Sequence, residues 1–178
     1  MRHTPALIMM PVAAFVCQVQ AADYLSTAEA QAVLFPQAST FSRQEVVLTK
    51  EQLKAIKKAS GVRQRKTMPP IWRAEREGEF LGWFYVDDVI GKHEFITYAA
   101  AISPEGEVRG IEIMSYRETH GDEVRNQQWR DQFVGKKADA PFKLNEDIIN
   151  ISGATLSCRN ITDGVKRLLV LQEMVLKE

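Results

Sequence analysis

The chain has 178 residues, of which 45% are hydrophobic and 26% are charged. This profile fits one ordinary globular domain with enough apolar side chains for a core, and it argues against a disordered chain. Lysine plus arginine and aspartate plus glutamate both number 23, so the charge balance gives no reason to expect nucleic acid or an anionic membrane surface as the partner. A small ligand or another protein is the expected partner.

The first residues of the chain have the pattern of an export signal. One arginine precedes an apolar stretch from Ala6 to Cys17, and small residues follow at Ala21 and Ala22. The apolar stretch is too short to span a bilayer comfortably, so cleavage is favoured over a retained anchor. We therefore predict a signal peptide over residues 1–21 and a periplasmic or other extracytoplasmic location.

Cysteine and histidine are sparse in the predicted mature chain. Cys158 is its one cysteine, so no intrachain disulfide is expected. The two histidines, His93 and His120, lack the i, i+4 pairing of a helical metal motif, and we interpret them as isolated surface residues. No metal site is predicted.

Residues 22–79 are predicted as a helical segment packed on the domain that follows. Ser26 or Thr27 can cap a short helix that runs through Leu34 and ends before Pro36. A second segment, LTKEQLKAIKKASG, is predicted as an amphipathic helix capped at one end by Thr49, with Gly61 as its stop.

Positive charge is concentrated from Lys54 to Lys66, in this second helix and in the VRQRK sequence after it. A solvated face is the ordinary interpretation of such a run. Docking of an acidic partner is the alternative, and it stays open on the sequence alone.

Residues 80–178 are predicted to form the main domain. Three segments, 80–91, 93–103 and 107–116, are rich in aromatic and β-branched residues, which predicts antiparallel strands, and Pro104 to Gly106 have the composition of a hairpin turn. A helix is expected over residues 122–133. Its apolar positions would be Val124, Trp129 and Phe133, with Gly135 beyond its end. Helices that flank an antiparallel sheet predict the α+β class.

The C-terminal segment combines a glycine-containing run with a helical pattern. Ile161, Val165 and Leu168 recur at near-helical spacing, which predicts a buried helix that begins at SGATLS, residues 152–157. A helix N-terminus favours anions, and Gly153 would let one approach the backbone closely. The alternative is that Ser152, Thr155 or Ser157 simply caps the helix.

The SGATLS sequence resembles the SGAT signature of the FMN-binding domain family. This family includes the periplasmic flavin subunits of bacterial sodium-pumping NADH:quinone oxidoreductase and of the related Rnf electron-transport complex. The resemblance implies that the phosphate of FMN is esterified to Thr155 by a flavin transferase. It also implies a phosphate site formed by the residues around that threonine: Ser152, Gly153, Ala154, Leu156 and Ser157.

A second segment, YRETHGDEVRNQQWRDQFVGKK, resembles the family in the same order along the chain. The matching residues are Glu118, Thr119, Gly121, Trp129, Gln132, Phe133, Gly135 and Lys136. Through this resemblance, which extends over roughly residues 80 to 175, we expect Glu118, Thr119 and Gly121 to lie near the flavin. One departure is that Ile149 stands where the family usually has aspartate, six residues before the threonine; the nearest polar residues are Asp147 and Asn150.

Several neighbouring residues have a functional and a structural interpretation. Arg159 could contact the phosphate or face solvent, and Cys158 could be a reactive thiol or a small buried residue. The large rings that could contact the flavin or belong to the core are Trp83, Tyr85, Tyr116 and Trp129.

The resulting hypothesis is an exported FMN protein that relays electrons between a membrane-bound donor and another redox partner. It would be an electron carrier or a subunit of an oxidoreductase more than a stand-alone enzyme, because the flavin carries the redox chemistry. The alternatives are an exported binding module without flavin and an enzyme with Cys158 as nucleophile and His93 or His120 as base. No spacing in the sequence supports the last pairing.

Overall fold

The computed structural model describes residues 22–176 of the chain. The predicted signal peptide, residues 1–21, lies outside this range. The described residues form one six-stranded sheet in the order β1-β6-β5-β4-β3-β2, with antiparallel pairing at each step. The predicted α+β class is confirmed.

Strands from both predicted segments, residues 22–79 and residues 80–178, form the sheet. β4 (Glu79–Ile90), β5 (Phe95–Ile102) and β6 (Val108–Tyr116) correspond to the three predicted strands, and the turn between β5 and β6 contains Pro104 to Gly106. The N-terminal segment is not only helical, because it adds β1 (Ala22–Asp23), β2 (Thr40–Gln44) and β3 (Ile71–Arg76). β3 pairs along most of its length with β4, so residues 22–79 complete the same sheet.

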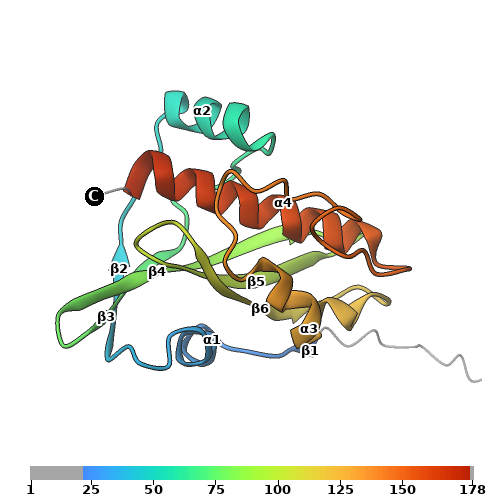
Figure 1. Ribbon diagram of the computed structural model, residues 1–178, viewed down its shortest axis with the longest axis horizontal. Helices are drawn as coiled ribbons and strands as arrows, with labels where there is room; N and C mark the ends of the chain where they lie inside the picture. Colours follow the sequence, from blue (N-terminus) through green and yellow to red (C-terminus); the bar gives the residue numbers. More distant parts are fainter. Residues whose placement is uncertain (1–21, 177–178) are drawn as a thin grey trace, which may run out of the picture.

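Helices cover both faces of this sheet, as Figure 1 shows. α1 (Thr27–Leu34) packs below it on the smaller of two apolar clusters, which includes Ala30, Phe84 and Met114. α4 (Thr155–Leu171) packs above it on the larger cluster and continues into a π-helical turn, Gln172–Leu176. The predicted inward positions of α4 are buried, since Ile161, Val165 and Leu168 are at most 2% exposed.

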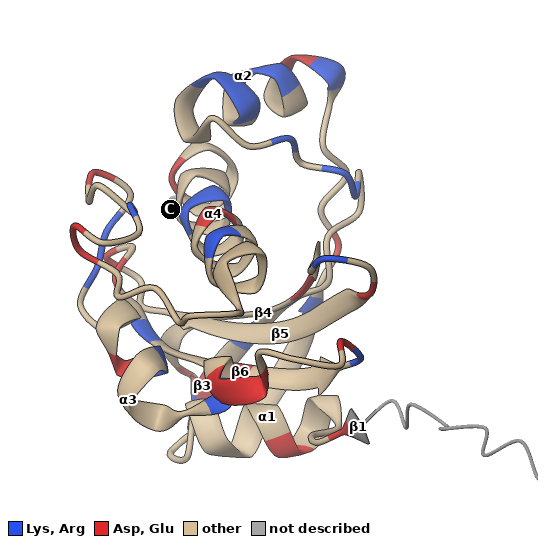
Figure 2. Ribbon diagram, turned by 90° about the vertical axis from the view of Figure 1, so that its right-hand side faces the viewer, with Lys and Arg blue, Asp and Glu red and all other residues tan. Residues whose placement is uncertain are grey.

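The two predicted N-terminal helices are confirmed with their caps. Ser26 caps α1, and Thr49 caps α2 (Lys50–Ser60); each forms a reciprocal capping box with the residue three positions later. α2 ends at Gly61 in the left-handed conformation. α2 rests on α4 as an outer layer (Figures 1 and 2).

The single helix predicted over residues 122–133 is wrong, because the chain breaks it into three pieces. A 3₁₀ turn (Asp122–Arg125) is followed by α3 (Gln127–Arg130) and by a second 3₁₀ turn (Asp131–Phe133). In a continuous helix Val124 and Trp129 would point about 140° apart, yet both are buried. The break at Asn126, which has an extended ψ of 127°, lets both side chains reach the core.

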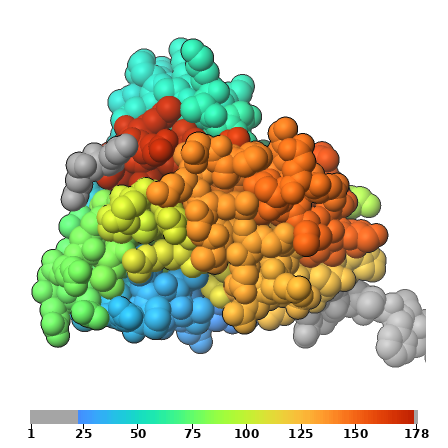
Figure 3. Space-filling model, viewed as in Figure 1, coloured from blue at the N-terminus to red at the C-terminus, as the bar shows by residue number. Residues whose placement is uncertain are grey.

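The long connection from β6 to α4 wraps across the front of the molecule. Figure 3 shows this connection, in yellow-orange to orange, as a continuous surface that ends where α4 begins. Among the described residues, no helix has the length and apolar character needed to cross a bilayer.

Candidate functional site

A hollow of about 250 Å³ lies at the N-terminus of α4. It is lined by residues from three separate parts of the chain: Lys92, His93, Glu118, Thr119, His120, Gly153, Ala154, Thr155, Leu156 and Ser157. We refer to it as the α4 hollow. The two segments that carry the family resemblance, far apart in sequence, therefore meet at one place.

The first turn of α4 is open toward the α4 hollow. Its N-cap residue is Ala154, and no side chain caps the helix there. The predicted alternative, a simple cap by Ser152, Thr155 or Ser157, is therefore wrong. Within the described part of the chain the backbone N–H groups of residues 155–157 have no hydrogen-bond partner. The helix dipole adds positive potential at the same end, so this turn suits an anion.

Glycine at position 153 leaves the approach to these N–H groups clear. Gly153 has a φ of +84°, and no heavy atom lies within 4 Å of the place where a Cβ would stand. Left-handed backbone at this position suits glycine. Ser152 lies just before it and is exposed, outside the lining of the α4 hollow.

Thr155 is half-buried at the floor of the α4 hollow, and its hydroxyl has a defined partner. Asn150 donates a hydrogen bond from Nδ2 to Thr155 Oγ1 at 3.1 Å. The other polar candidate, Asp147, is engaged elsewhere, because its carboxylate accepts hydrogen bonds from Lys136 Nζ and from the N–H groups of Phe142 and Lys143. Asn150 is thus the polar side chain beside the threonine hydroxyl.

The second resembling segment supports the chain just before α4. Trp129 donates from Nε1 to the Ile149 carbonyl at 2.8 Å, and Gln132 Oε1 accepts the Ile149 N–H at 2.7 Å. Lys136 forms the ion pair with Asp147 at 2.9 Å. These contacts fix the backbone that leads to Thr155 and the α4 hollow.

Segment 116–121 is locked to the first turn of α4. The Tyr116 hydroxyl donates to the His120 carbonyl at 2.6 Å and lies 3.1 Å from Ser157 Oγ. Gly121 does not line the α4 hollow but packs behind it. A Cβ at Gly121 would stand 2.6 Å from the Cβ of Ala154, so only glycine permits this close approach.

Glu118 holds the hairpin between β4 and β5 at the mouth of the α4 hollow. Its Oε1 accepts the N–H groups of His93 and Glu94 at 2.5 and 3.0 Å. Partial burial opposes ionisation of Glu118, but the N–H groups of Glu94, His93 and Lys92 together outweigh it and hold the pKa of this carboxyl below its ordinary value. The fixed hairpin brings the exposed side chains of Lys92 and His93 to the α4 hollow.

His120 lines the α4 hollow although it was interpreted as an isolated surface histidine. Lys92 and His93 also line it and were not named as site residues. His93 was interpreted as an isolated surface histidine, and Lys92 carries no motif. Their position depends on the turn after β4 and on Glu118, which is more than 20 residues away along the chain. A lysine and a histidine in a hairpin give no local sequence signal that they will line a distant site.

Other candidate residues lie in structural positions. Trp83, Tyr85, Tyr116 and Trp129 are all buried in the larger core cluster. Cys158 is fully buried, and burial raises the pKa of its thiol, which does not suit a nucleophile. Arg159 is exposed and lines a different surface depression with Phe142 and Asp163, so it does not reach the α4 hollow.

Residues 91–170 match the model of the FMN-binding domain family. The resemblance to that family is thereby confirmed over this segment. The segment includes the hairpin, segment 118–121 and the first turn of α4, which are the parts that form the α4 hollow. FMN is accordingly the cofactor that this match assigns to the domain.

Two solved structures have a similar fold. The chain is similar to NqrC of Shewanella oneidensis, with 14% identity, a TM-score of 0.55 and coverage of 80% of this chain and 86% of that one. It is also similar to a component of the Na⁺-translocating NADH-quinone reductase of Parabacteroides distasonis, with 13% identity, a TM-score of 0.53 and coverage of 86% and 85%. No curated protein matches the chain by sequence.

Proposed function

We propose that the chain is an exported electron carrier that binds FMN at the α4 hollow, with the flavin phosphate at the first turn of α4. The observation that supports this most directly is the meeting of residues 118–121 and 153–157 at an uncapped helix N-terminus. Both segments belong to the part of the chain that matches the FMN-binding family.

The α4 hollow fits the phosphate end of the cofactor. Its volume of about 250 Å³ lies below the range of roughly 300–1,000 Å³ for pockets that enclose a whole ligand of drug size. It therefore suits the phosphate and the adjoining part of the ribityl chain. The N–H groups of Thr155 to Ser157 would bind the phosphate oxygens, and Lys92 would supply a cation at the rim.

A covalent bond at Thr155 is the finer part of the proposal. A flavin transferase would take the FMN group from a flavin dinucleotide. The bond between Thr155 Oγ1 and the flavin phosphorus would form, the P–O–P bond of the dinucleotide would break, the hydroxyl proton would be released and the nucleoside monophosphate would leave. Asn150 Nδ2 donates to that oxygen and so orients it. The resulting phosphodiester would keep one negative charge beside the N–H groups of α4.

The residues of the chain position the cofactor and tune it, and the bound flavin supplies the redox chemistry. Glu118 would keep the hairpin and its cation at the rim through its hydrogen bonds to the N–H groups of His93 and Glu94. Tyr116 and Ser157 would hold segment 116–121 against α4. A rigid site lowers the structural change that accompanies each electron transfer.

Export and membrane-bound partners complete the proposal. The signal-like composition of residues 1–21 supports an extracytoplasmic location. The likeness to reductase subunits supports a membrane-bound oxidoreductase complex as the redox partner.

The test is the intact mass and visible absorbance of the full chain, produced in a host that also expresses a flavin transferase. Wild-type protein should be yellow and keep the mass of one FMN group after denaturation, and Thr155→Val should lose that mass. Thr119→Val is the matched control, since Thr119 lines the same hollow, and it should keep the adduct. Flavin that is lost on denaturation would remove the covalent bond from the proposal. A colourless protein that does not bind added FMN would overturn the function itself.

A further inference from the structure

Positive charge is concentrated in one short part of a chain that is neutral overall. Residues 50–66 contain seven lysines and arginines and a single acidic residue, Glu51. The full sequence carries 23 residues of each sign. The rest of the chain therefore has a net charge of −6, and the asymmetry requires a physical account.

α2 presents its lysines on the side that faces away from the molecule. Leu53 and Ile56 turn toward α4 and the core, and Ile56 is fully buried. The outward residues Lys50, Lys54, Lys57 and Lys58 are exposed. Figure 2 shows them in blue along the outer layer formed by α2, with further blue positions on the segment that follows.

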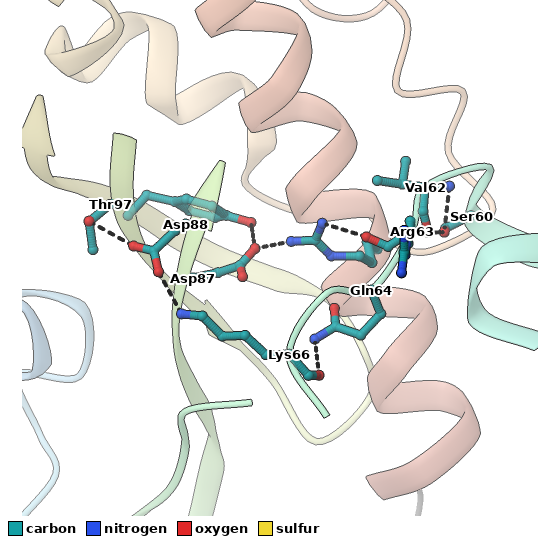
Figure 4. Close-up of polar contacts among 10 residues, drawn as sticks. Ser60, Val62, Arg63, Gln64, Lys66, Asp87, Asp88 and Thr97 are labelled. Carbon is teal, nitrogen blue, oxygen red and sulfur yellow. Dashed lines mark hydrogen bonds and ion pairs between the residues drawn. The ribbon is translucent and has the colours of Figure 1, made fainter. Parts of the chain in front are cut away.

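The segment after α2 is held firmly while two of its arginines stay exposed. Arg167 Nη1 donates to the Arg63 carbonyl at 3.3 Å, and Gln64 Nε2 donates to the Lys66 carbonyl at 2.9 Å. Lys66 forms an ion pair with Asp88 (Figure 4). The backbone is thus fixed to β4 and α4, and the charged groups of Arg63 and Arg65 remain at the surface.

Among the described residues, the exposed cations of α2 and of the segment after it form no ion pair with a carboxylate, unlike several surface cations elsewhere. Elsewhere in the described range, Arg117, Lys137 and Lys143 each pair with a carboxylate. No ion pair within that range involves Lys50, Lys54, Lys57, Lys58, Arg63 or Arg65, which we call the basic surface. Like charges at i, i+4, as in Lys50/Lys54 and Lys54/Lys58, weaken a helix, whereas Lys57 and Lys58 in the last turn are favoured by the helix dipole.

We propose that the basic surface is a docking site for the acidic face of a redox partner protein. This inference rests on the proposed electron-carrier function. Unpaired cations on a fixed backbone attract a partner of opposite charge and speed its encounter with the protein. The energetic cost of concentrating these charges is offset when an acidic surface neutralises them.

The basic surface also leads toward the flavin site. Arg63 and Arg65 line a small depression that is also lined by Asn160 and by the acidic residues Asp88 and Asp163. Asn160 Nδ2 donates to the Ile90 carbonyl at 2.6 Å, directly before the hairpin that carries Lys92 and His93. A partner that contacts the arginines would therefore lie beside the α4 hollow.

A protein surface fits these cations better than a membrane. A helix that binds a bilayer needs a free apolar face. In α2 that face is already packed on α4, through residues such as Leu53 and Ile56. What α2 offers outward is charge, which matches an acidic protein surface.

The experiment measures binding of the full chain to an acidic [2Fe–2S] ferredoxin, with and without bound FMN. At about 20 mM salt, where screening is weak, wild-type protein should bind, and the triple variant Lys54→Glu, Lys57→Glu, Lys58→Glu should bind at least about tenfold more weakly. The corresponding triple change to glutamine should weaken binding by an intermediate amount. It removes the positive charges without adding negative ones, so it guards against a folding defect in the glutamate variant. The control, Arg76→Glu, Arg109→Glu, Lys137→Glu, changes the net charge equally at exposed positions outside the basic surface and should bind like wild type.

Each result decides the proposal independently of the flavin. The proposal would be overturned if wild-type protein showed no salt-dependent binding to ferredoxin. It would also be overturned if the glutamate triple in the basic surface and the control triple lost equal binding affinity. Stronger binding to vesicles of phosphatidylcholine with phosphatidylserine than to ferredoxin would replace the protein partner by a membrane. A chain that fails to hold FMN yet binds ferredoxin through the basic surface would refute the electron-carrier function and leave the docking surface intact.

Discussion

Asn150 Nδ2 donates a hydrogen bond to Thr155 Oγ1 at 3.1 Å, so the hydroxyl proposed to carry the flavin is oriented from within the chain. Loss of this bond should leave the hydroxyl free to rotate. We expect Asn150→Ala to slow flavin attachment by about tenfold or more, because misplaced reacting groups lose rate steeply. A time course of intact mass with purified flavin transferase measures this. Gln128→Ala, at an exposed position, is the control; equal rates for Asn150→Ala and wild type would assign Asn150 no part in attachment.

Ile149 stands where the FMN-binding family usually has aspartate, and its side chain is 69% exposed. Its backbone is held by Trp129 and Gln132, so the side chain can change without disturbing the fold. We expect Ile149→Asp to attach flavin faster than wild type, with a change in the free energy of unfolding within about 0.5 kcal/mol. Ile149→Asn supplies a polar side chain without charge. A rate for Ile149→Asp below that of the asparagine variant would contradict this expectation.

Gly121 packs against α4 in a left-handed conformation with a φ of +95°. An added Cβ would stand 2.6 Å from Ala154 Cβ and from the Tyr116 hydroxyl. We expect Gly121→Ala to lower the free energy of unfolding by roughly 2–4 kcal/mol, from backbone strain and overpacking together. Gly106→Ala separates backbone strain from overpacking, because Gly106 has a φ of +75° but no atom within 4 Å of its Cβ position. Urea unfolding measures both variants, and similar losses in the two would argue against the close contact.

The pKa of Glu118 is lowered in the folded protein, which gives a pH dependence of stability. Burial works against the shift, and the N–H groups of Glu94, His93 and Lys92 outweigh it. A carboxyl with a depressed folded pKa contributes stability above its unfolded pKa, and that contribution is lost as the pH falls through the folded value. Denaturant unfolding between pH 7 and pH 3 should therefore show a smaller acid-induced loss for Glu118→Gln than for wild type. Parallel pH profiles would mean that the hydrogen bonds to the hairpin do not depend on the charge.

The elements predicted correctly from sequence are those with local signals. The capping boxes at Ser26 and Thr49 involve residues only three positions apart, so the sequence contains everything that forms them. The break at Asn126 depends on which core surfaces Val124 and Trp129 reach, and no local pattern reveals that. Strand β2 was missed because it is a short edge strand without a buried residue, so it lacks the apolar alternation of a half-buried strand.

The residues of the candidate site likewise fall into those with a local sequence signal and those without one. Thr155, Gly153 and Glu118 were named from motifs, and the α4 hollow brings them together. Lys92 and His93 enter it through the hydrogen bonds that Glu118 makes across the sheet, which the sequence does not display. The capping interpretation of Ser152, Thr155 and Ser157 was wrong because Ser157 turns inward to Tyr116 and the hydroxyl of Thr155 is paired with Asn150.

Arg167 and Asp87 form an ion pair with both side chains almost fully buried, at 6% and 8% exposure. Asp87 also accepts a hydrogen bond from the Tyr98 hydroxyl, and Arg167 donates to the Arg63 carbonyl, so the pair joins β4, β5, α4 and the segment after α2. Removal of one partner leaves the other buried and uncompensated. We expect Arg167→Met to lower the free energy of unfolding by about 3–5 kcal/mol, and Asp87→Leu with Arg167→Met to recover part of that loss.

An exposed ion pair provides the comparison for the buried one. Lys143 and Glu146 are more than half exposed and lie 3.4 Å apart. Lys143→Met should cost less than about 1 kcal/mol in the same urea experiment, because solvent screens exposed pairs. Arg167 of the buried pair also anchors the backbone of Arg63, a residue of the basic surface. Arg167→Met should therefore weaken ferredoxin docking even under conditions where the variant stays folded. Unchanged docking in folded Arg167→Met would show that the charges of the basic surface act without a fixed backbone.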